Sequence, residues 1–161
     1  VQAGYLDPSY HFMLDHQLWL RMARLAPIQH IPEILAAARY HPQAKNVLQA
    51  AAFGDEALRI LNWIKELPEF QVYYTARRNR ITAGAYRLKA RYLLDGAQPG
   101  PALRAYIQAL RYHPGFTLQH WHRMLYALLS LVGLKKLDKL YYRLARQKDQ
   151  PVISSPRNPA Q

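Results

Sequence analysis

The feature that most constrains the fold is a long stretch of helical periodicity, from residue 46 to about residue 147, that only proline and glycine interrupt. In residues 46–67 hydrophobic side chains recur close to every 3.6 residues, with Pro68 as the stop and Gly54 as an expected break. Residues 70–147 are expected to be helical throughout, with interruptions at 96–101, 114–115 and 133. The pattern predicts a bundle of about five helices.

One helix pair inside this bundle shows a small–large pattern of the tetratricopeptide kind, if its turn holds one extra residue. Its positions are Tyr92, Gly96, Ala102, Tyr106, Ala109 and Pro114. No second copy follows at a period of about 34 residues, so a single helical hairpin packed on the rest is expected. Residues 148–161 contain many polar residues and prolines, and we expect this tail to be disordered.

The first 45 residues have a different pattern. A helix is expected from Asp15 to Pro27, with Asp15 at or beside its N-cap and Trp19 one turn later on the same face. Its expected buried stripe consists of Leu14, Leu18, Met22 and Leu25. Residues 28–32 alternate in the manner of a short strand, and residues 36–40 are a second extended candidate.

Four short motifs in this region have an informative order and spacing. They are Gly4-Tyr5-Leu6-Asp7, Asp15-His16-Gln17-Leu18-Trp19-Leu20-Arg21, Ile31-Pro32-Glu33 and Arg39-Tyr40-His41-Pro42. Together they resemble the end of the catalytic domain of a family-two glycosyltransferase with the GT-A fold. The resemblance starts at residue 1, which implies that the half holding the nucleotide sugar lies outside this sequence.

The resemblance implies a mainly α chain in three parts. Residues 1–45 would be the C-terminal remnant of an α/β GT-A domain with two short strands, residues 46–147 a helical extension, and residues 148–161 a disordered tail. The parent protein would transfer a sugar, with inversion, from a nucleotide-sugar donor to the hydroxyl of a sugar or lipid-linked acceptor. The isolated chain is expected to be inactive, because the nucleotide pocket is outside it.

The resemblance also implies roles for individual residues. Asp15 would be the general base that takes the proton of the attacking hydroxyl, and helix capping is the alternative role of that carboxylate. Trp19, Arg39 and Lys45 would bind substrate. His41 would help to ligate a divalent metal, Mg or Mn, with most ligands outside this chain, and its alternative role is that of a polar residue ending a strand.

The chain departs from the family pattern at three places. Leu14 stands where family members carry an acidic residue before the base, and Gln17 stands where many have Asp. The six aspartates include no Asp-x-Asp pair, the motif through which the family binds its metal. Asp7 matches a Gly-x-x-Asp turn, for which a structural role is expected.

The charge of the chain bears on its partners. With 22 Lys and Arg against 10 Asp and Glu, the net charge of +12 attracts polyanions. Residues 116–147 combine an apolar stripe with later lysines and arginines, so this stretch forms either hairpin core or an anionic-membrane interface. Nucleic-acid binding is not expected, because no zinc knuckle, RNP-like strand or helix-turn-helix is present.

Two broader expectations complete the sequence-based picture. The absence of cysteine excludes disulfides and thiolate chemistry and fits a cytoplasmic protein. The protein is further expected to be peripheral on the inner face of the membrane. The alternative class is a non-enzymatic, basic helical module that docks on a membrane or on a protein. The three histidines His113, His120 and His122 are not expected to bind metal, since no carboxylate accompanies them.

Overall fold

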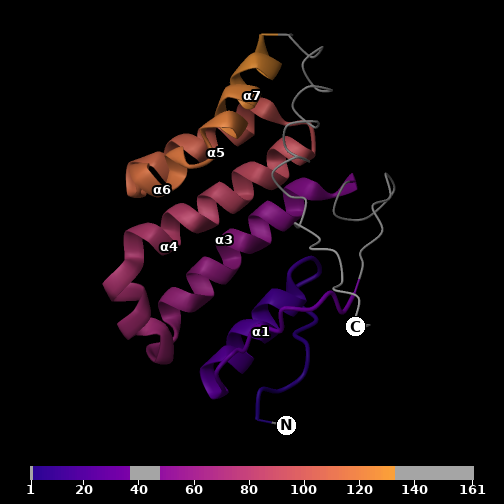
Figure 1. The fold of residues 1–161 in the computed structure, drawn as a ribbon, viewed down its shortest axis with the longest axis vertical. Helices are drawn as coiled ribbons and strands as arrows, with labels where there is room; N and C mark the ends of the chain where they lie inside the picture. The colour runs from indigo at the N-terminus through magenta and orange to yellow at the C-terminus, as the bar shows by residue number, and fades with distance from the viewer. Residues whose placement is uncertain (1, 37–47, 133–161) are drawn as a thin grey trace, which may run out of the picture.

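The computed structural model describes residues 2–36 and 48–132. Over these ranges the chain forms six helices and no strand. The helices are α1 (Leu14–Leu25), α3 (Ala50–Glu66), α4 (Pro68–Asp95), α5 (Pro99–Tyr112), α6 (Pro114–Leu118) and α7 (Trp121–Leu131). In Figure 1, α3, α4 and α5 lie side by side, α1 lies beyond α3, and α6 and α7 lie beyond α4, next to α5. α4 is therefore the central helix of the bundle.

The α/β interpretation of residues 1–45 is wrong for the part of this region that the structure describes. Residues 28–32, predicted as a short strand, are exposed irregular chain. A strand needs a neighbour to take its backbone hydrogen bonds, and Pro32 removes one donor from this short stretch. Of the second candidate, residues 36–40, only Ala36 lies within the described residues, and it is not in a strand.

The first helix begins as predicted but buries a partly different face. α1 has Met13 as its N-cap, so Asp15 is in its first turn, and the chain turns extended at Ala26, just before Pro27. The buried side chains are Tyr10, Met13 and Gln17, whereas Met22 and Leu25 are about half exposed. The predicted stripe is therefore only partly correct: Leu14 packs against the core together with Leu20, whereas Met22 and Leu25 lie off the face that α1 turns toward α3.

The helix predicted for residues 46–67 corresponds to α3, and Gly54 does not break it. Gly54 is buried where α3 crosses α4, and a Cβ added there would lie 3.1 Å from Cα of Lys89. The glycine thus permits close approach of two helix backbones. Pro68 ends α3 as expected and also occupies the first turn of α4, where a proline needs no hydrogen-bond donor. α4 itself bends at Arg77, whose backbone angles are not helical.

We expect Gly54→Ala to destabilise the protein by about 1–3 kcal/mol, because the new methyl group must push α4 away from α3. Gly84→Ala is the matched control: Gly84 is also inside a helix, but the nearest atom to its added Cβ is 3.9 Å away. There the change should be neutral or slightly stabilising, since alanine favours helix. Urea unfolding of the two variants measures the difference, and equal free energies of unfolding would contradict the close-crossing role of Gly54.

The predicted helical hairpin corresponds to the C-terminal part of α4 and α5. Its core contains small residues on both helices, with Ala90 of α4 and Ala102 and Ala109 of α5 fully buried around Tyr106. The turn between the helices covers Gly96 to Gln98. α7 closes this core through Ala127. The tail predicted for residues 148–161 lies outside the described residues.

Candidate functional site

The segment that leads into α1 is fixed by one carboxylate from α3. Both oxygens of Glu56 accept backbone hydrogen bonds: Oε1 from His11 at 2.7 Å, and Oε2 from Phe12 and Met13, each at 2.8 Å. Burial raises the pKa of the Glu56 carboxyl, but the three N–H donors lower it by more, so its pKa is below the ordinary value. Glu56 is therefore an ionised anchor that sets where α1 begins.

Two arginines fix the chain that precedes the residues bound by Glu56. Arg59 donates to the backbone oxygen of Ser9 at 2.6 Å and lies over the ring of Tyr10, 4.2 Å from its centroid. Arg21 reaches back from α1 and donates to the carbonyls of Ala3 and Tyr5 at 2.6 and 2.5 Å. The Gly-Tyr-Leu-Asp motif is thus held against α1, and the two residues Ser9 and Tyr10 that follow it are held against α3.

Asp7 and Gly4 have the structural roles expected of turn residues. Asp7 Oδ1 accepts from the backbone N–H of Ser9 at 2.9 Å, and its carbonyl accepts from Tyr10 at 3.1 Å. Gly4 has a positive φ of 72°, which favours glycine. A Cβ added to it would lie 2.9 Å from a guanidinium nitrogen of Arg21, so a side chain at this position would disturb the arginine as well.

Asp15 is an accessible carboxylate in the first turn of the helix that Glu56 anchors. About half of its side chain (50%) is exposed, and Oδ1 accepts from the backbone N–H of His16 at 2.8 Å. Nδ1 of His16 lies 3.0 Å from the same oxygen. Partial burial raises the pKa of the Asp15 carboxyl, but the hydrogen bonds from His16 lower it by more, and it ends below its ordinary value. The carboxylate is therefore ionised at neutral pH, as a general base must be.

Beside Asp15 an apolar groove opens between α1, α3 and α4. Its volume is about 330 Å³, and the rings of His16 and Trp19, 5.0 Å apart, lie on its α1 side. The groove is lined by Met13, His16, Trp19, Leu20, Ala23, Ile28, Ala57, Ile60, Leu61, Ile64, Ile81, Gly84, Ala85 and Leu88. Asp15 is outside the lining set, but its hydrogen-bond partner His16 belongs to it. A ligand in the groove would therefore meet an aromatic wall next to an ionised carboxylate.

Only part of the predicted site can be placed. Asp15 and Trp19 lie one turn apart on α1. Arg39, His41 and Lys45, predicted to bind substrate and metal, lie outside the described residues. Within residues 2–36 and 48–132, no group of three or more His, Asp or Glu side chains could hold a metal ion. The described residues therefore do not by themselves provide a site for the implied Mg or Mn.

Sequence reasoning missed the residues that position Asp15. Glu56 was the strongest missed signal, because it is an acidic residue beside the apolar face of α3 that contains Phe53, Ala57 and Ile60. A carboxylate at such a position needs a buried partner. His16 was also missed, since its hydrogen bond to Asp15 depends on the side-chain conformation and not on spacing.

Comparison with known proteins gives no family assignment: no protein-family model, curated protein or solved structure matches the chain. Among the helices of the described ranges, none combines the length and the apolar character that crossing a membrane requires. Fold and local geometry therefore define the chain, over the described residues, as a helical protein with an exposed carboxylate beside an apolar groove.

Proposed function

We propose that this chain carries the base and the acceptor side of an inverting sugar transferase, and that the pocket for the nucleotide sugar is supplied by residues outside it. The observation that carries the proposal is the state of Asp15: ionised, half exposed and fixed at the start of a helix anchored by Glu56. The motif resemblance adds the identity of the chemistry.

The proposed reaction uses few groups of this chain. The acceptor hydroxyl hydrogen-bonds to the Asp15 carboxylate, which takes its proton as the oxygen attacks the anomeric carbon. The bond to the nucleotide diphosphate breaks on the opposite face, so the configuration at that carbon inverts. Trp19 supports the apolar face of the acceptor, and the groove next to it accommodates a hydrophobic portion such as the chain of a lipid-linked acceptor. The divalent metal that the resemblance implies would be held by His41 and by ligands outside this chain, and it would supply positive charge for the leaving diphosphate.

The surface near Asp15 supports an incomplete site. Hydrophobic side chains remain exposed along and after α1, among them Trp19 (53%), Ile28 (77%) and Ile34 (75%). Large apolar side chains that stay exposed in this number are typical of a surface that another part of the protein or a partner covers. In the proposal, the nucleotide-binding half of the enzyme covers it.

The test compares the 161-residue chain with the complete product of its gene. We expect no turnover of any nucleotide sugar by the chain alone, because the donor pocket is outside it, and transfer by the complete product. Release of nucleotide diphosphate from a panel of nucleotide sugars measures both. Turnover by the isolated chain, or none by the complete product with all donors and acceptors tried, would refute the proposal.

One observation favours a second candidate, the docking module. Trp121, Leu125, Leu128 and Val132 share a face of the α7 region, and each of these side chains is exposed by 44% or more. An exposed apolar helix face on a protein of high positive charge suits an anionic membrane interface. The docking module would be the favoured function if the complete product transferred no sugar and the chain bound anionic vesicles.

A further inference from the structure

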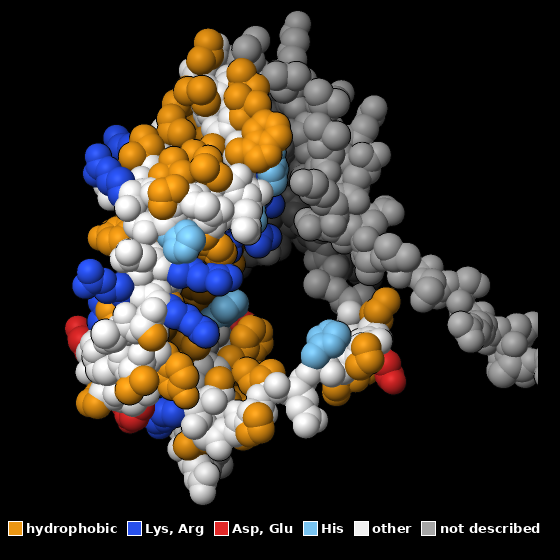
Figure 2. All heavy atoms as spheres, turned by 60° about the vertical axis from the view of Figure 1, so that its left-hand side comes forward, with side chains coloured by type: hydrophobic (Ala, Val, Ile, Leu, Met, Phe, Trp, Pro, Cys, Tyr) orange, Lys and Arg blue, Asp and Glu red, His pale blue; other side chains and the backbone are white. Residues whose placement is uncertain are grey.

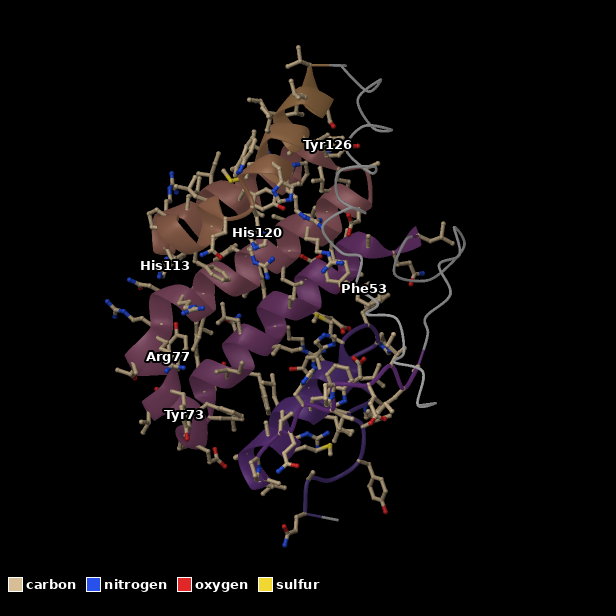
Figure 3. The ribbon with its side chains drawn as sticks, in the orientation of Figure 1. Phe53, Tyr73, Arg77, His113, His120 and Tyr126 are labelled. Carbon is tan, nitrogen blue, oxygen red and sulfur yellow. The ribbon has the colours of Figure 1, made fainter. Side chains whose placement is uncertain are left out.

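A second group of charged residues lies on the opposite side of the bundle from α1. Arg87 and Arg91 extend from α4, and Arg123 extends from the first turns of α7. The fields of all three arginines reach His120, the N-cap of α7, and help to lower the pKa of its ring after the larger effect of burial. Figure 3 shows His120 between α4 and the layer of α6 and α7. His120 and Arg87 also share a neighbour, the ring of Phe116, whose centroid lies 6.4 Å from that of the His120 ring and 5.4 Å from the Arg87 guanidinium.

Arg87 is the central residue of this cluster. Its guanidinium lies 5.4 Å from the ring centroid of Phe116, which also has Arg80 at 5.5 Å. Its Nε is buried, and no acceptor within the described part of the chain is in hydrogen-bond reach. Burial has the largest effect on the pKa of the Arg87 guanidinium and lowers it; the nearby Tyr106 acts in the opposite direction, and the repulsion of Arg91 and Arg123 lowers it further. A buried N–H donor on a cation is costly when it has no acceptor, so this geometry favours an anion at Nε.

The neighbouring carboxylate does not neutralise the cluster. Asp95, one turn after Arg91 on α4, is 3.7 Å from Arg91, which is long for an ion pair. Burial raises the pKa of the Asp95 carboxyl by more than Arg123 and Arg91 lower it. This weakly paired carboxylate thus lies within the fields of two of the three guanidinium groups, those of Arg91 and Arg123. Figure 2 shows blue Lys and Arg side chains and pale-blue His side chains gathered across the middle of one face of the molecule.

We propose that the cluster of Arg87, Arg91, Arg123 and His120 is a binding site for a phosphate group, either a free phosphate or diphosphate or the phosphate of a lipid head group. Arg87 would donate from its unpaired Nε, and Arg123 and Arg91 would supply further charge-assisted hydrogen bonds. α7 adds the positive end of its dipole, because His120 is its N-cap and makes no side-chain cap bond.

The site is separate from Asp15. Asp15 is on α1, across α3 from the cluster on α4 and α7, and none of the residues lining the apolar groove belongs to the cluster. The proposal therefore does not depend on sugar transfer and can be tested on the 161-residue chain itself.

The test follows the Nε–Hε resonance of Arg87 by NMR while inorganic pyrophosphate is titrated into the chain at physiological ionic strength, which screens diffuse attraction. We expect a saturable shift of that resonance. Arg87→Gln or Arg123→Gln should weaken binding by about ten- to a hundredfold, the loss of a hydrogen bond between charged groups. Arg104→Gln on α5 is the matched control, because Arg104 is exposed and the charge change is the same. The affinity of this variant for pyrophosphate should change by less than about twofold.

A parallel arm uses phosphatidylcholine vesicles with and without phosphatidic acid, which separates the two sources of phosphate. Saturable binding of pyrophosphate identifies a free phosphate ligand, and binding of phosphatidic acid vesicles alone identifies a lipid head group. Either result supports the site if Arg87→Gln or Arg123→Gln abolishes the binding and Arg104→Gln does not. Arg123 is partly exposed, so its variant serves if Arg87→Gln fails to fold. No shift in either arm, or equal losses in all three variants, overturns the proposal.

Discussion

In the complete product of the gene, Asp15→Asn should slow sugar transfer by about 10²- to 10⁴-fold, the usual contribution of a general base. Asparagine preserves the shape of the side chain and can still accept the backbone N–H of His16, but it cannot take a proton at neutral pH. Donor binding should be preserved within about twofold, because the base touches the acceptor hydroxyl and not the nucleotide.

The control for this variant is Asp55→Asn, which removes the same charge from an exposed carboxylate on α3 whose partner is Lys89. Its transfer rate should equal that of the unmodified protein. The pH dependence adds an independent check. Since the folded-state pKa of Asp15 is lowered, transfer should persist into mildly acidic solution and decline only as the pH falls through that lowered pKa. Normal transfer by Asp15→Asn would remove Asp15 from the mechanism.

Glu56→Gln should be the most destabilising single substitution of a charged residue in the N-terminal region, with a loss of about 2–4 kcal/mol in the free energy of unfolding. The carboxylate accepts three backbone N–H groups through two oxygens. A glutamine offers one oxygen and turns an N–H₂ group toward backbone donors. The start of α1 should then loosen, which faster hydrogen exchange at Phe12 and Met13 would report.

The sign of the pH effect follows from the direction of the pKa shift. The pKa of Glu56 is lower in the folded protein than in the unfolded chain. The contribution of Glu56 to the free energy of unfolding is therefore complete at pH values above the unfolded-state pKa, and it is lost as the pH falls through the folded-state pKa. The Glu56→Gln variant should lack this acid-dependent loss. Glu66→Gln on the same helix is the control, because Glu66 is exposed. Equal free energies of unfolding for the two variants across this pH range would show that Glu56 is no anchor.

Within residues 48–132 the helices of the bundle could be predicted because local chemistry determines them; residues 133–147, also predicted to be helical, lie outside the described residues. Pro68, Pro99 and Pro114 each occupy the first turn of a helix, and the residues before them end the preceding helix or turn. The hairpin core could also be predicted, since its small residues recur at helical spacing. The two strands could not, because a strand depends on a partner elsewhere in the chain, and the alternation of residues 28–32 contains no information about that partner.

The face of α1 shows a second limit. Four apolar residues at helical spacing predicted the buried stripe, yet Gln17 is buried and Met22 and Leu25 are half exposed. The rotation of a short helix is set by its contacts with the rest of the fold, here those of Glu56 with the backbone before α1 and those of Arg21 with the carbonyls of Ala3 and Tyr5. Contacts such as that of Glu56 join residues far apart in sequence, so periodicity does not reveal them. The role of Asp15 as a base stays a prediction from its motif, whereas the contact with its partner His16 emerged only from the geometry.

Everything proposed for the reaction rests on a carboxylate that deprotonates a nucleophile attacking from the side opposite the leaving group. The most direct measurement is therefore the anomeric configuration of the first product formed by the complete gene product, read by proton NMR before mutarotation or further processing. The account predicts a sugar of inverted configuration relative to the donor. A product of retained configuration would contradict it, because a single displacement assisted by Asp15 cannot yield that isomer.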